Sequence, residues 1–206
     1  MITILDYGLG NVRAFLNVYK RLDIEARAVS DPAQLRSGER LILPGVGAFD
    51  HAMDLLDASG MKGRMEELVR DEGSPVLGVC VGMQMLADGS DEGRRPGLGW
   101  VPGRVRALKG RNDTVALPMP HMGWNDVSPT RGCPLFSGMD DARFYFLHSF
   151  YYEPAHADQA LATVDYGGDF ACAVGRGAIY GVQFHPEKSH HWGARLLQNF
   201  AEQPLC

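Results

Sequence analysis

The chain has 206 residues, of which 45% are hydrophobic and 22% charged, a composition typical of a soluble globular protein with one sizeable core. A net charge of −5, with no block of like charges, argues against a nucleic-acid-binding surface. We expect neither a signal peptide nor a membrane partner, because the start lacks a basic segment and no stretch approaches the roughly 20 apolar residues of a membrane span.

Short apolar runs alternate with amphipathic segments through the first half of the chain. Strands are predicted at Ile2–Leu5, Ala26–Val29, Arg40–Leu43 and Val76–Val79. Helices are predicted where Val12, Phe15, Leu16 and Tyr19 recur at helical spacing, and at Phe49–Leu56 and Lys62–Asp71. This alternation implies a parallel sheet with right-handed crossovers.

The second half has more strands and fewer helices. Strands are predicted at Val101–Leu108, Arg143–Phe146, Ala160–Val164, Phe170–Val174 and Ile179–Phe184, a surface loop at Asp88–Pro96, and a last helix at Gly193–Ala201. We therefore expect a single α/β domain over residues 1–206. Its central sheet should be twisted and mostly parallel, with helices on both faces and additional antiparallel strands.

Cys80 lies in the sequence Pro75-Val-Leu-Gly-Val-Cys80-Val-Gly82-Met-Gln84. An apolar strand that ends in Gly-x-Cys-x-Gly before a segment of helical spacing is the layout of a nucleophile elbow, with sulfur in place of a hydroxyl. The glycines permit a sharp turn in which neighbouring Cβ atoms would not fit, and the N-terminus of the following helix favours a thiolate. The alternative is a buried structural cysteine.

A histidine and a carboxylate follow much later, in Gly181-Val-Gln-Phe-His185-Pro-Glu187. Pro186 argues against a helix through this pair, and residues two apart in an extended segment project to the same side, so His185 and Glu187 are expected to face together. A carboxylate beside an imidazole fixes its tautomer and stabilises the imidazolium. We predict a triad of Cys80, His185 and Glu187, although a lone histidine here would more often belong to the core.

These two motifs resemble those of the triad-type (class I) glutamine amidotransferases. Further stretches resemble, within that family, the glutaminase subunits of imidazole glycerol phosphate synthases: Asp6-Tyr-Gly-Leu-Gly-Asn11, Pro44-Gly-Val-Gly47-Ala-Phe49, His121-Met-Gly-Trp124-Asn125, Tyr145-Phe-Leu-His148-Ser149-Phe-Tyr and Pro186-Glu-Lys188-Ser189. The resemblance runs in order from Asp6 to Phe200. It implies that glutamine is hydrolysed to glutamate and ammonia through a thioester on Cys80, with His185 moving protons and Glu187 orienting His185.

The resemblance also implies residues that bind the oxyanion and the substrate. Backbone donors for the oxyanion are expected at Val81 and in the Pro44–Gly47 loop, at Val46 and Gly47, where glycine makes a peptide flip cheap; a simple strand-to-helix turn is the alternative. Residues expected to contact substrate are Gly45, Gln84, His148, Ser149 and Phe150. Gln84 is equally compatible with an exposed helix position.

The ammonia would be useless once protonated in bulk water, so the resemblance implies a docked partner. That partner is a cyclase (synthase) subunit with a (β/α)₈ barrel, forming a heterodimer through which ammonia is channelled for histidine biosynthesis. Trp124 is the first interface candidate because tryptophan is enriched at binding hot spots, with core packing as the alternative. Asn11, Tyr145 and Lys188 are expected near the same contact.

We expect no cofactor and no metal. Gly8-Leu-Gly10 lacks the third glycine of a dinucleotide fingerprint, and adjacent His190-His191 rarely share a metal. Cys133, Cys172 and Cys206 are expected to be structural or exposed bystanders, and their scattered spacing suits a reducing cytoplasm.

Three other functions compete with this one. A paralogous amidotransferase subunit would supply ammonia to a sugar-modifying synthase in surface-polysaccharide synthesis, and would respond to that partner alone. A thiol hydrolase of esters or peptides would act without a partner and without preference for glutamine. A degenerate binding module would be expected to lack a triad member, and all three are present.

Overall fold

A buried parallel sheet underlies the first half of the chain. The computed structural model describes residues 1–111 and 117–202. In it, strands pair in parallel in the order β2 (Ala26–Val29), β1 (Ile2–Leu5), β3 (Arg40–Gly45) and β4 (Val76–Cys80). Every residue of β1 and β4 is buried, as expected for strands covered on both faces. All four predicted strands are confirmed.

Strands of the second half extend this sheet, mostly antiparallel. The strand β13 (Ile179–Val182) pairs in parallel with β4 and antiparallel with β12 (Asp169–Arg176). The sheet continues through β10 (Phe150–Pro154), β6 (Gly103–Ala107) and the short β5 (Gly89–Ser90), while β11 (Ala160–Asp165) and β8 (Ser128–Pro129) add to β12. Eleven strands join in this sheet within the described part of the chain.

A second, smaller sheet packs over the first. It consists of β7 (His121–Asp126) paired antiparallel with β9 (Arg143–His148). An aromatic cluster joins it to the large sheet: the ring of Phe184 stacks on Phe144 with centroids 3.9 Å apart and meets Phe146 at 5.6 Å. Because Phe184 precedes His185, this packing fixes the chain that leads into the candidate site.

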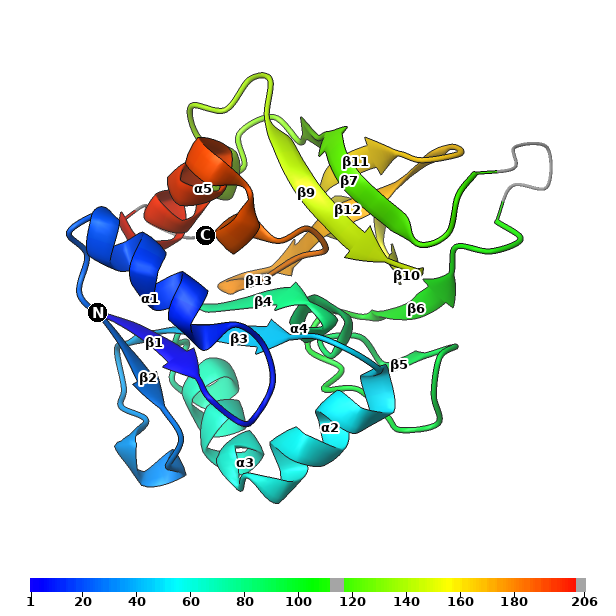
Figure 1. The fold of residues 1–206 in the computed structure, drawn as a ribbon. Coiled ribbons are helices and arrows are strands. Elements are labelled where there is room, and N and C mark those ends of the chain that lie inside the picture. Colours follow the sequence, from blue (N-terminus) through cyan, green and yellow to red (C-terminus); the bar gives the residue numbers. More distant parts are fainter. Residues whose placement is uncertain (112–116, 203–206) are drawn as a thin grey trace.

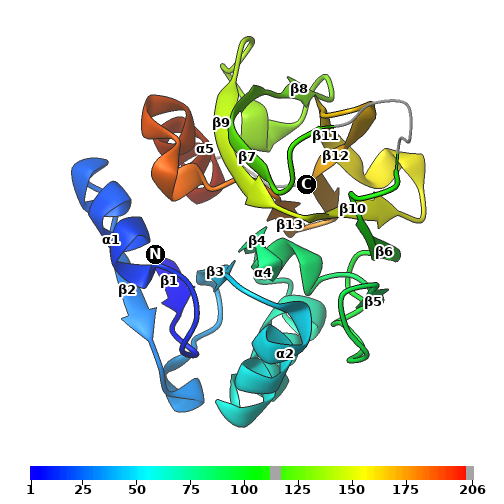
Figure 2. The ribbon, with the colours of Figure 1, turned by 45° about the vertical axis from the view of Figure 1, so that its right-hand side comes forward.

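Helices cover both faces of the sheet, as predicted. The helices α1 (Val12–Arg21) and α5 (His190–Glu202) lie on one side, and α2 (Phe49–Ala58) and α3 (Met61–Glu66) on the other (Figure 1, Figure 2). Short helical turns complete the fold: α4 (Val81–Gln84), a π turn at Glu67–Asp71, and 3₁₀ turns at Pro32–Gln34, Pro134–Phe136, Ala157–Gln159 and Pro186–Lys188. Across the described ranges, no helix is long and apolar enough to cross a membrane.

Several boundaries differ from the predictions. The helix expected over Lys62–Asp71 is regular only to Glu66 and then widens into the π turn. The segment expected to be a loop over Asp88–Pro96 contains the short strand β5. The rest of it is anchored to α2, because the side-chain carboxylate of Asp50 accepts hydrogen bonds from the backbone N–H groups of Arg94 and Arg95. The strands β7 and β10 were not predicted as strands.

Candidate active site

The turn that carries Cys80 is as sharp as its glycines predict. Cys80 ends β4 with φ +56° and ψ −113°, a conformation that costs a non-glycine residue about 1–3 kcal/mol. A Cβ on Gly78 would lie 2.5 Å from the carbonyl oxygen of Gly82, and a Cβ on Gly82 would lie 2.0 Å from that of Leu43. Only glycine fits at either position, so the neighbours of Cys80 permit its strained backbone.

The helix after Cys80 is a single turn. Beyond α4, the carbonyls of Met85, Leu86 and Ala87 accept from the N–H groups of Leu98, Trp100 and Gly99, which lie in the following loop. These bonds end the helix after Gln84. As the first residue of the turn, Val81 has no carbonyl partner within α4 for its N–H group, which is the group predicted to donate to an oxyanion.

His185 connects the sulfur to a carboxylate. Its Nδ1 donates to Oε1 of Glu187 at 2.8 Å, which leaves Nε2 for other partners, and His185 lines the same cavity as Cys80, whose side chain is near enough to raise the pKa of the imidazole. Both members of the His–Glu pair are buried. Within the described residues, the other oxygen of Glu187, Oε2, has no hydrogen-bond partner. The structure therefore brings the three predicted triad residues together.

The electrostatics of this group favour a charged imidazole. Burial disfavours the imidazolium, but hydrogen bonds to Cys80 and Glu187 and the charges of both outweigh it and raise the pKa of His185 to about 9. A protonated His185 beside the sulfur is the partner that a thiolate needs.

The chain around His185 is not extended as predicted. The predicted strand through Phe184 ends at Val182, and Pro186–Lys188 forms a 3₁₀ turn in which Pro186 takes the first helical position, where a missing N–H is harmless. Ser189 holds this turn against β9: its hydroxyl donates to the carbonyl of His185 at 2.6 Å and accepts from the N–H of Tyr145 at 2.9 Å. The N–H of His185 completes the clamp by donating to the carbonyl of Tyr145.

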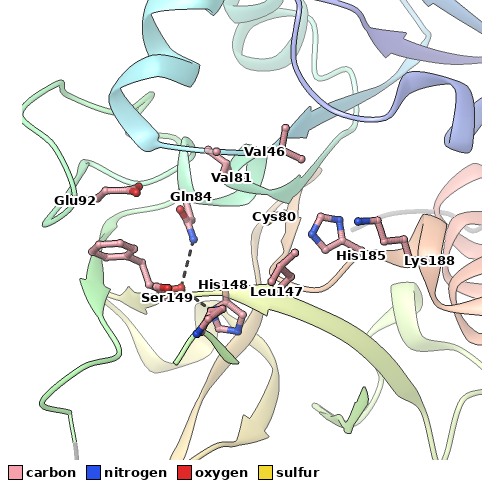
Figure 3. Close-up of a pocket in the computed structure, with 13 residues that line it drawn as sticks. Val46, Cys80, Val81, Gln84, Glu92, Leu147, His148, Ser149, His185 and Lys188 are labelled. Atoms are coloured by element: carbon pink, nitrogen blue, oxygen red, sulfur yellow. Dashed lines mark hydrogen bonds between the residues drawn. The ribbon is translucent and has the colours of Figure 1, made fainter. Parts of the chain in front are cut away.

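A cavity of about 320 Å³ opens beside the sulfur, large enough for a small amino acid. Its walls come from the loop after β3, the elbow, the junction of β9 and β10, and the His185 turn (Figure 3). The lining residues are Val46, Gly47, Cys80, Val81, Gln84, Glu92, Pro120, Leu147, His148, Ser149, Phe150, His185 and Lys188.

Most of the predicted binding residues line this cavity, and one does not. Gln84 is buried, which rules out the exposed alternative, and its Nε2 donates to the carbonyl of Phe150 at 3.4 Å. Gly45 is not among the lining residues; it pairs with Cys80 in the sheet, where a Cβ would meet the backbone nitrogen of Gly82 at 2.4 Å. Its place is packing between the loop and the elbow.

The loop predicted to bind the oxyanion is open to the cavity. Val46 is exposed, and Gly47 has φ +84°, which favours glycine, with no atom within 4 Å of where its Cβ would lie. Glycine at this position tolerates either sign of φ, which is what the predicted peptide flip requires.

Glu92 lines the cavity and was not predicted. Its Oε2 accepts from the N–H of Phe49 at the start of α2, which holds the carboxylate at the mouth. In the view of Figure 3, Gln84 lies between Glu92 and Cys80. The sequence places Glu92 in a polar loop with no pattern to distinguish it from other surface acids.

A buried pair of histidines supports the β9–β10 junction. The carbonyl of Phe150 can only accept, so Nδ1 of His148 donates to it at 2.7 Å; Nε2 of His148 then accepts from Nδ1 of His121 at 2.9 Å. Burial lowers the pKa of His148 to about 3 and that of His121 to about 4, so both rings are neutral at pH 7.

The predicted interface residues mostly gather next to the cavity. Trp124 is 41% exposed, which excludes core packing; its ring stacks on His190 at 5.3 Å and meets Tyr145 edge-on at 6.4 Å. Nζ of Lys188 lies 5.9 Å from the centre of the Tyr145 ring. Asn11 is exposed and caps α1, accepting from the N–H of Ala14.

The remaining cysteines lie away from the cavity. Cys172 is buried in β12, where burial raises the pKa of its thiol well above the ordinary value, and Cys133 is half-buried. Cys206 lies outside the described residues. Within residues 1–111 and 117–202, no cluster of three His, Cys, Asp or Glu side chains could hold a metal.

Comparisons with known proteins agree with this geometry. The family described as glutamine amidotransferase class-I matches residues 3–203. Imidazole glycerol phosphate synthase subunit HisH of Bdellovibrio bacteriovorus is 56% identical over 98% of this chain and 100% of that protein, and subunit HisH 2 of Pseudomonas aeruginosa is 45% identical over 98% and 99%. A solved glutamine amidotransferase shares the fold with a TM-score of 0.75, covering 97% of this chain and 96% of that one at 23% identity. With a family match and a close relative that both span nearly its whole length, the chain belongs to the class-I glutamine amidotransferase family.

Proposed function

We propose that this chain is the glutaminase subunit of an imidazole glycerol phosphate synthase and supplies ammonia for histidine biosynthesis. The observation that carries the proposal is that Cys80 and the Glu187-paired His185 line the same cavity, which is sized for an amino acid. Relatives named as this subunit, 56% and 45% identical, support the choice among amidotransferases.

In the proposed reaction, the Cys80 thiolate attacks the side-chain carbonyl carbon of glutamine and a tetrahedral oxyanion forms. Nε2 of His185 protonates the leaving nitrogen, so that ammonia departs and a thioester remains. A water molecule, deprotonated by His185, then attacks the thioester carbonyl; glutamate is released, and the Cys80 thiolate is restored beside the protonated His185. Glu187 keeps His185 in the tautomer that both steps need.

The oxyanion is stabilised by backbone N–H groups of Val81 and of the Val46–Gly47 loop. Loss of one such donor commonly lowers the rate by ~10²–10³. We propose that the loop takes its productive form when the partner docks, because glycine at position 47 tolerates either sign of φ and Val46 is exposed beside the proposed docking surface.

The α-amino and α-carboxylate groups of glutamine lie away from the sulfur in this proposal. Gln84 uses its Nε2 for protein contacts, so its Oε1 is free to accept from the substrate ammonium, and the Glu92 carboxylate offers an opposite charge at the mouth. Backbone groups of His148, Ser149 and Phe150 hold the substrate carboxylate.

We propose that the partner is a cyclase subunit with a (β/α)₈ barrel and that the pair is a heterodimer. Exposed apolar side chains beside the cavity support a docking surface: Met119, Met122, Trp124, Leu147 and Val46. Trp124 and Tyr145 face each other across β7 and β9, as do Met122 and Leu147. A reactive thiol suits the reducing cytoplasm, where we place the complex.

The test is a glutaminase assay of the purified chain alone, with the cyclase and its nucleotide ligand, and with a sugar-amidating synthase. We expect slow turnover alone and a large stimulation by the ligand-bound cyclase only. Stimulation by the sugar-amidating enzyme instead would assign the chain to the paralogous function. Fast hydrolysis without a partner, or equal activity on esters, would contradict the proposal.

A further inference from the structure

The side-chain amide of Gln183 contacts the Cys80 sulfur, and nothing in the mechanism above uses it. Nε2 of Gln183 donates to Sγ of Cys80 at 3.8 Å, and Gln183 is fully buried. Gln183 follows β13 and stands two residues before His185. One short segment after β13 therefore carries both the amide that donates to the sulfur and the imidazole that lines the same cavity.

The orientation of this amide is fixed by a neighbouring carbonyl. The Phe150 carbonyl can only accept, so Gln84 must turn its NH₂ group towards it, at 3.4 Å. The same Nε2 of Gln84 lies 3.0 Å from Gln183, and that atom of Gln183 must therefore be the acceptor Oε1. The remaining group of Gln183, its NH₂, is the one that faces the sulfur.

If Gln183 served only to fill space, an apolar side chain of the same size would do as well, and no hydrogen-bond donor would need to point at the sulfur. A buried amide is costly unless it is hydrogen-bonded, and the bond to Gln84 satisfies the oxygen of Gln183 alone. A thiol is a weak acceptor, whereas a thiolate accepts a stronger, charge-assisted bond. The Gln183 donor therefore favours the ionised form of Cys80 over the neutral form.

We propose that Gln183 is a positioning residue that stabilises the Cys80 thiolate and aims it into the cavity, while Gln84 holds Gln183 in the required orientation. The proposal deepens the proposed function, on which it rests for the identity of the nucleophile. It concerns the state of the sulfur before glutamine binds, so it can be tested without substrate and without partner.

The test measures alkylation of Cys80 by iodoacetamide as a function of pH, following the Cys80 peptide by mass spectrometry. In Gln183→Met, which keeps the size and removes the donor, we expect the pH midpoint of alkylation to rise by about one unit, the loss of one charge-assisted hydrogen bond. Gln84→Met should raise it in the same direction by less, because Gln183 is then free to turn. An unchanged midpoint in folded Gln183→Met would overturn the proposal.

Gln159→Met is the matched control. Gln159 is also a buried glutamine, but it lines a different cavity from Cys80. Its replacement should leave the midpoint of Cys80 alkylation unchanged. A shift as large as that of Gln183→Met would mean that loss of any buried glutamine perturbs the sulfur, and would contradict a specific role.

A measurement on the unmodified Gln183 covers the case in which Gln183→Met does not fold. The side-chain amide resonances of Gln183, assigned by NMR, should move with pH in step with alkylation, and should lose that dependence in Cys80→Ala. Resonances that ignore pH, or that titrate equally in Cys80→Ala, would overturn the proposal. If Gln183 behaves as expected but the chain shows no partner-stimulated glutamine hydrolysis, the proposed function is wrong, and the role of the Gln183–Cys80 contact still stands.

Discussion

The Cys80 sulfur receives its two polar contacts from residues that lie close together after β13. His185 supplies a base whose charged form is stabilised by Glu187, and Gln183 supplies an amide donor. Because His185 already leans towards protonation, its imidazolium provides the positive charge that a Cys80 thiolate needs when it attacks. Changes at single residues should therefore act mainly through the charge balance at the sulfur.

Replacing Glu187 with Gln should slow the reaction far more than it destabilises the fold. Burial lowers the pKa of His185, and the negative charge of Glu187 counteracts this effect. The amide of Gln carries no charge, so the pKa of His185 should fall from about 9. We expect glutamine turnover by the complex to drop by about 10²–10⁴, as for other triads that lose their carboxylate. Ammonia-dependent synthesis by the same complex should be unchanged, and glutamine turnover within a few-fold of the original would refute the role.

The histidine pair should make the fold sensitive to mild acid. His121 and His148 have pKa values of about 4 and 3 in the folded protein and near 6.5 when unfolded, so the unfolded chain binds more protons as pH falls below 6.5. Between pH 7 and pH 5 we expect the free energy of unfolding to fall by about 2 kcal/mol for each histidine. Urea denaturation at several pH values measures this slope, and His121→Asn should reduce it.

If the free energy of unfolding depended on pH as steeply in His121→Asn as in the unaltered protein, the acid sensitivity would have to arise from other residues. His185 contributes the opposite dependence: its raised pKa gives stability that is present below pH 6.5 and is lost as the pH rises through about 9. The two effects therefore occupy separate pH windows.

The sequence predicted the triad because each member lies in a motif with recognisable spacing. Gln183 lies in the same motif, but its contact with the sulfur depends on the bends at Gln183 and Phe184, which the extended-chain argument used for His185 and Glu187 does not describe. Glu92 could not be predicted, since its position depends on a hydrogen bond to the start of α2, more than forty residues earlier. Periodicity carries no information about such long-range contacts.

At the scale of elements, the elbow between β4 and α4 depends on close backbone contact. The strand β3 lies directly against the turn, and the carbonyl of Leu43 occupies the space where a side chain on Gly82 would begin. The loop after β3 and the nucleophile are thus held at a fixed separation by backbone atoms, which cannot adjust as side chains do.

Gly82→Ala should therefore destabilise the protein strongly. The added Cβ would lie 2.0 Å from the Leu43 carbonyl oxygen, and moving the backbone to relieve this should cost about 2–4 kcal/mol of unfolding free energy. Gly63→Ala is the matched control: it lies in α3 with no atom within 4 Å of the new Cβ, and should stabilise by about 0.5–1 kcal/mol. Similar effects of both changes in urea denaturation would contradict the packing argument.

The elements of the parallel half were predictable, and those of the small sheet were not. Strands such as β1 and β4 are apolar throughout because both faces are covered, which gives a clear signal. In the strand β7 the polar His121 is buried, whereas the apolar Met122 and Trp124 are exposed. A strand normally shows the opposite arrangement, with apolar side chains facing the core. We propose that a partner covers this exposed apolar surface.

At the scale of the whole molecule, the catalytic cavity and the apolar surface adjoin. Lys188 and Leu147 line the cavity, and Lys188 also packs on Tyr145, which meets Trp124. The Ser189 clamp ties the backbone of β9 to the His185 turn. A partner that docked on β7 and β9, as we propose, would contact the strand that holds the His185 turn.

Trp124→Ala should weaken partner binding without unfolding the chain. Its ring is 41% exposed, so truncation should change the free energy of unfolding by less than about 1 kcal/mol, whereas a hot-spot tryptophan contributes about 2 kcal/mol or more to binding. We expect the Kd for the cyclase to rise at least ~30-fold by calorimetry. Arg21→Ala, exposed at the far end of α1 from Asn11, should leave Kd unchanged. An unchanged Kd in Trp124→Ala would place the docking surface elsewhere.

The most direct measurement compares two nitrogen sources in the complex that carries Cys80→Ala. If the sulfur is the nucleophile, glutamine-dependent product formation should disappear, while synthesis from added ammonium salt continues at the rate of the unaltered complex. Glutamine-dependent synthesis that persists above a few per cent would mean that another group attacks the amide, and would contradict the account at its centre.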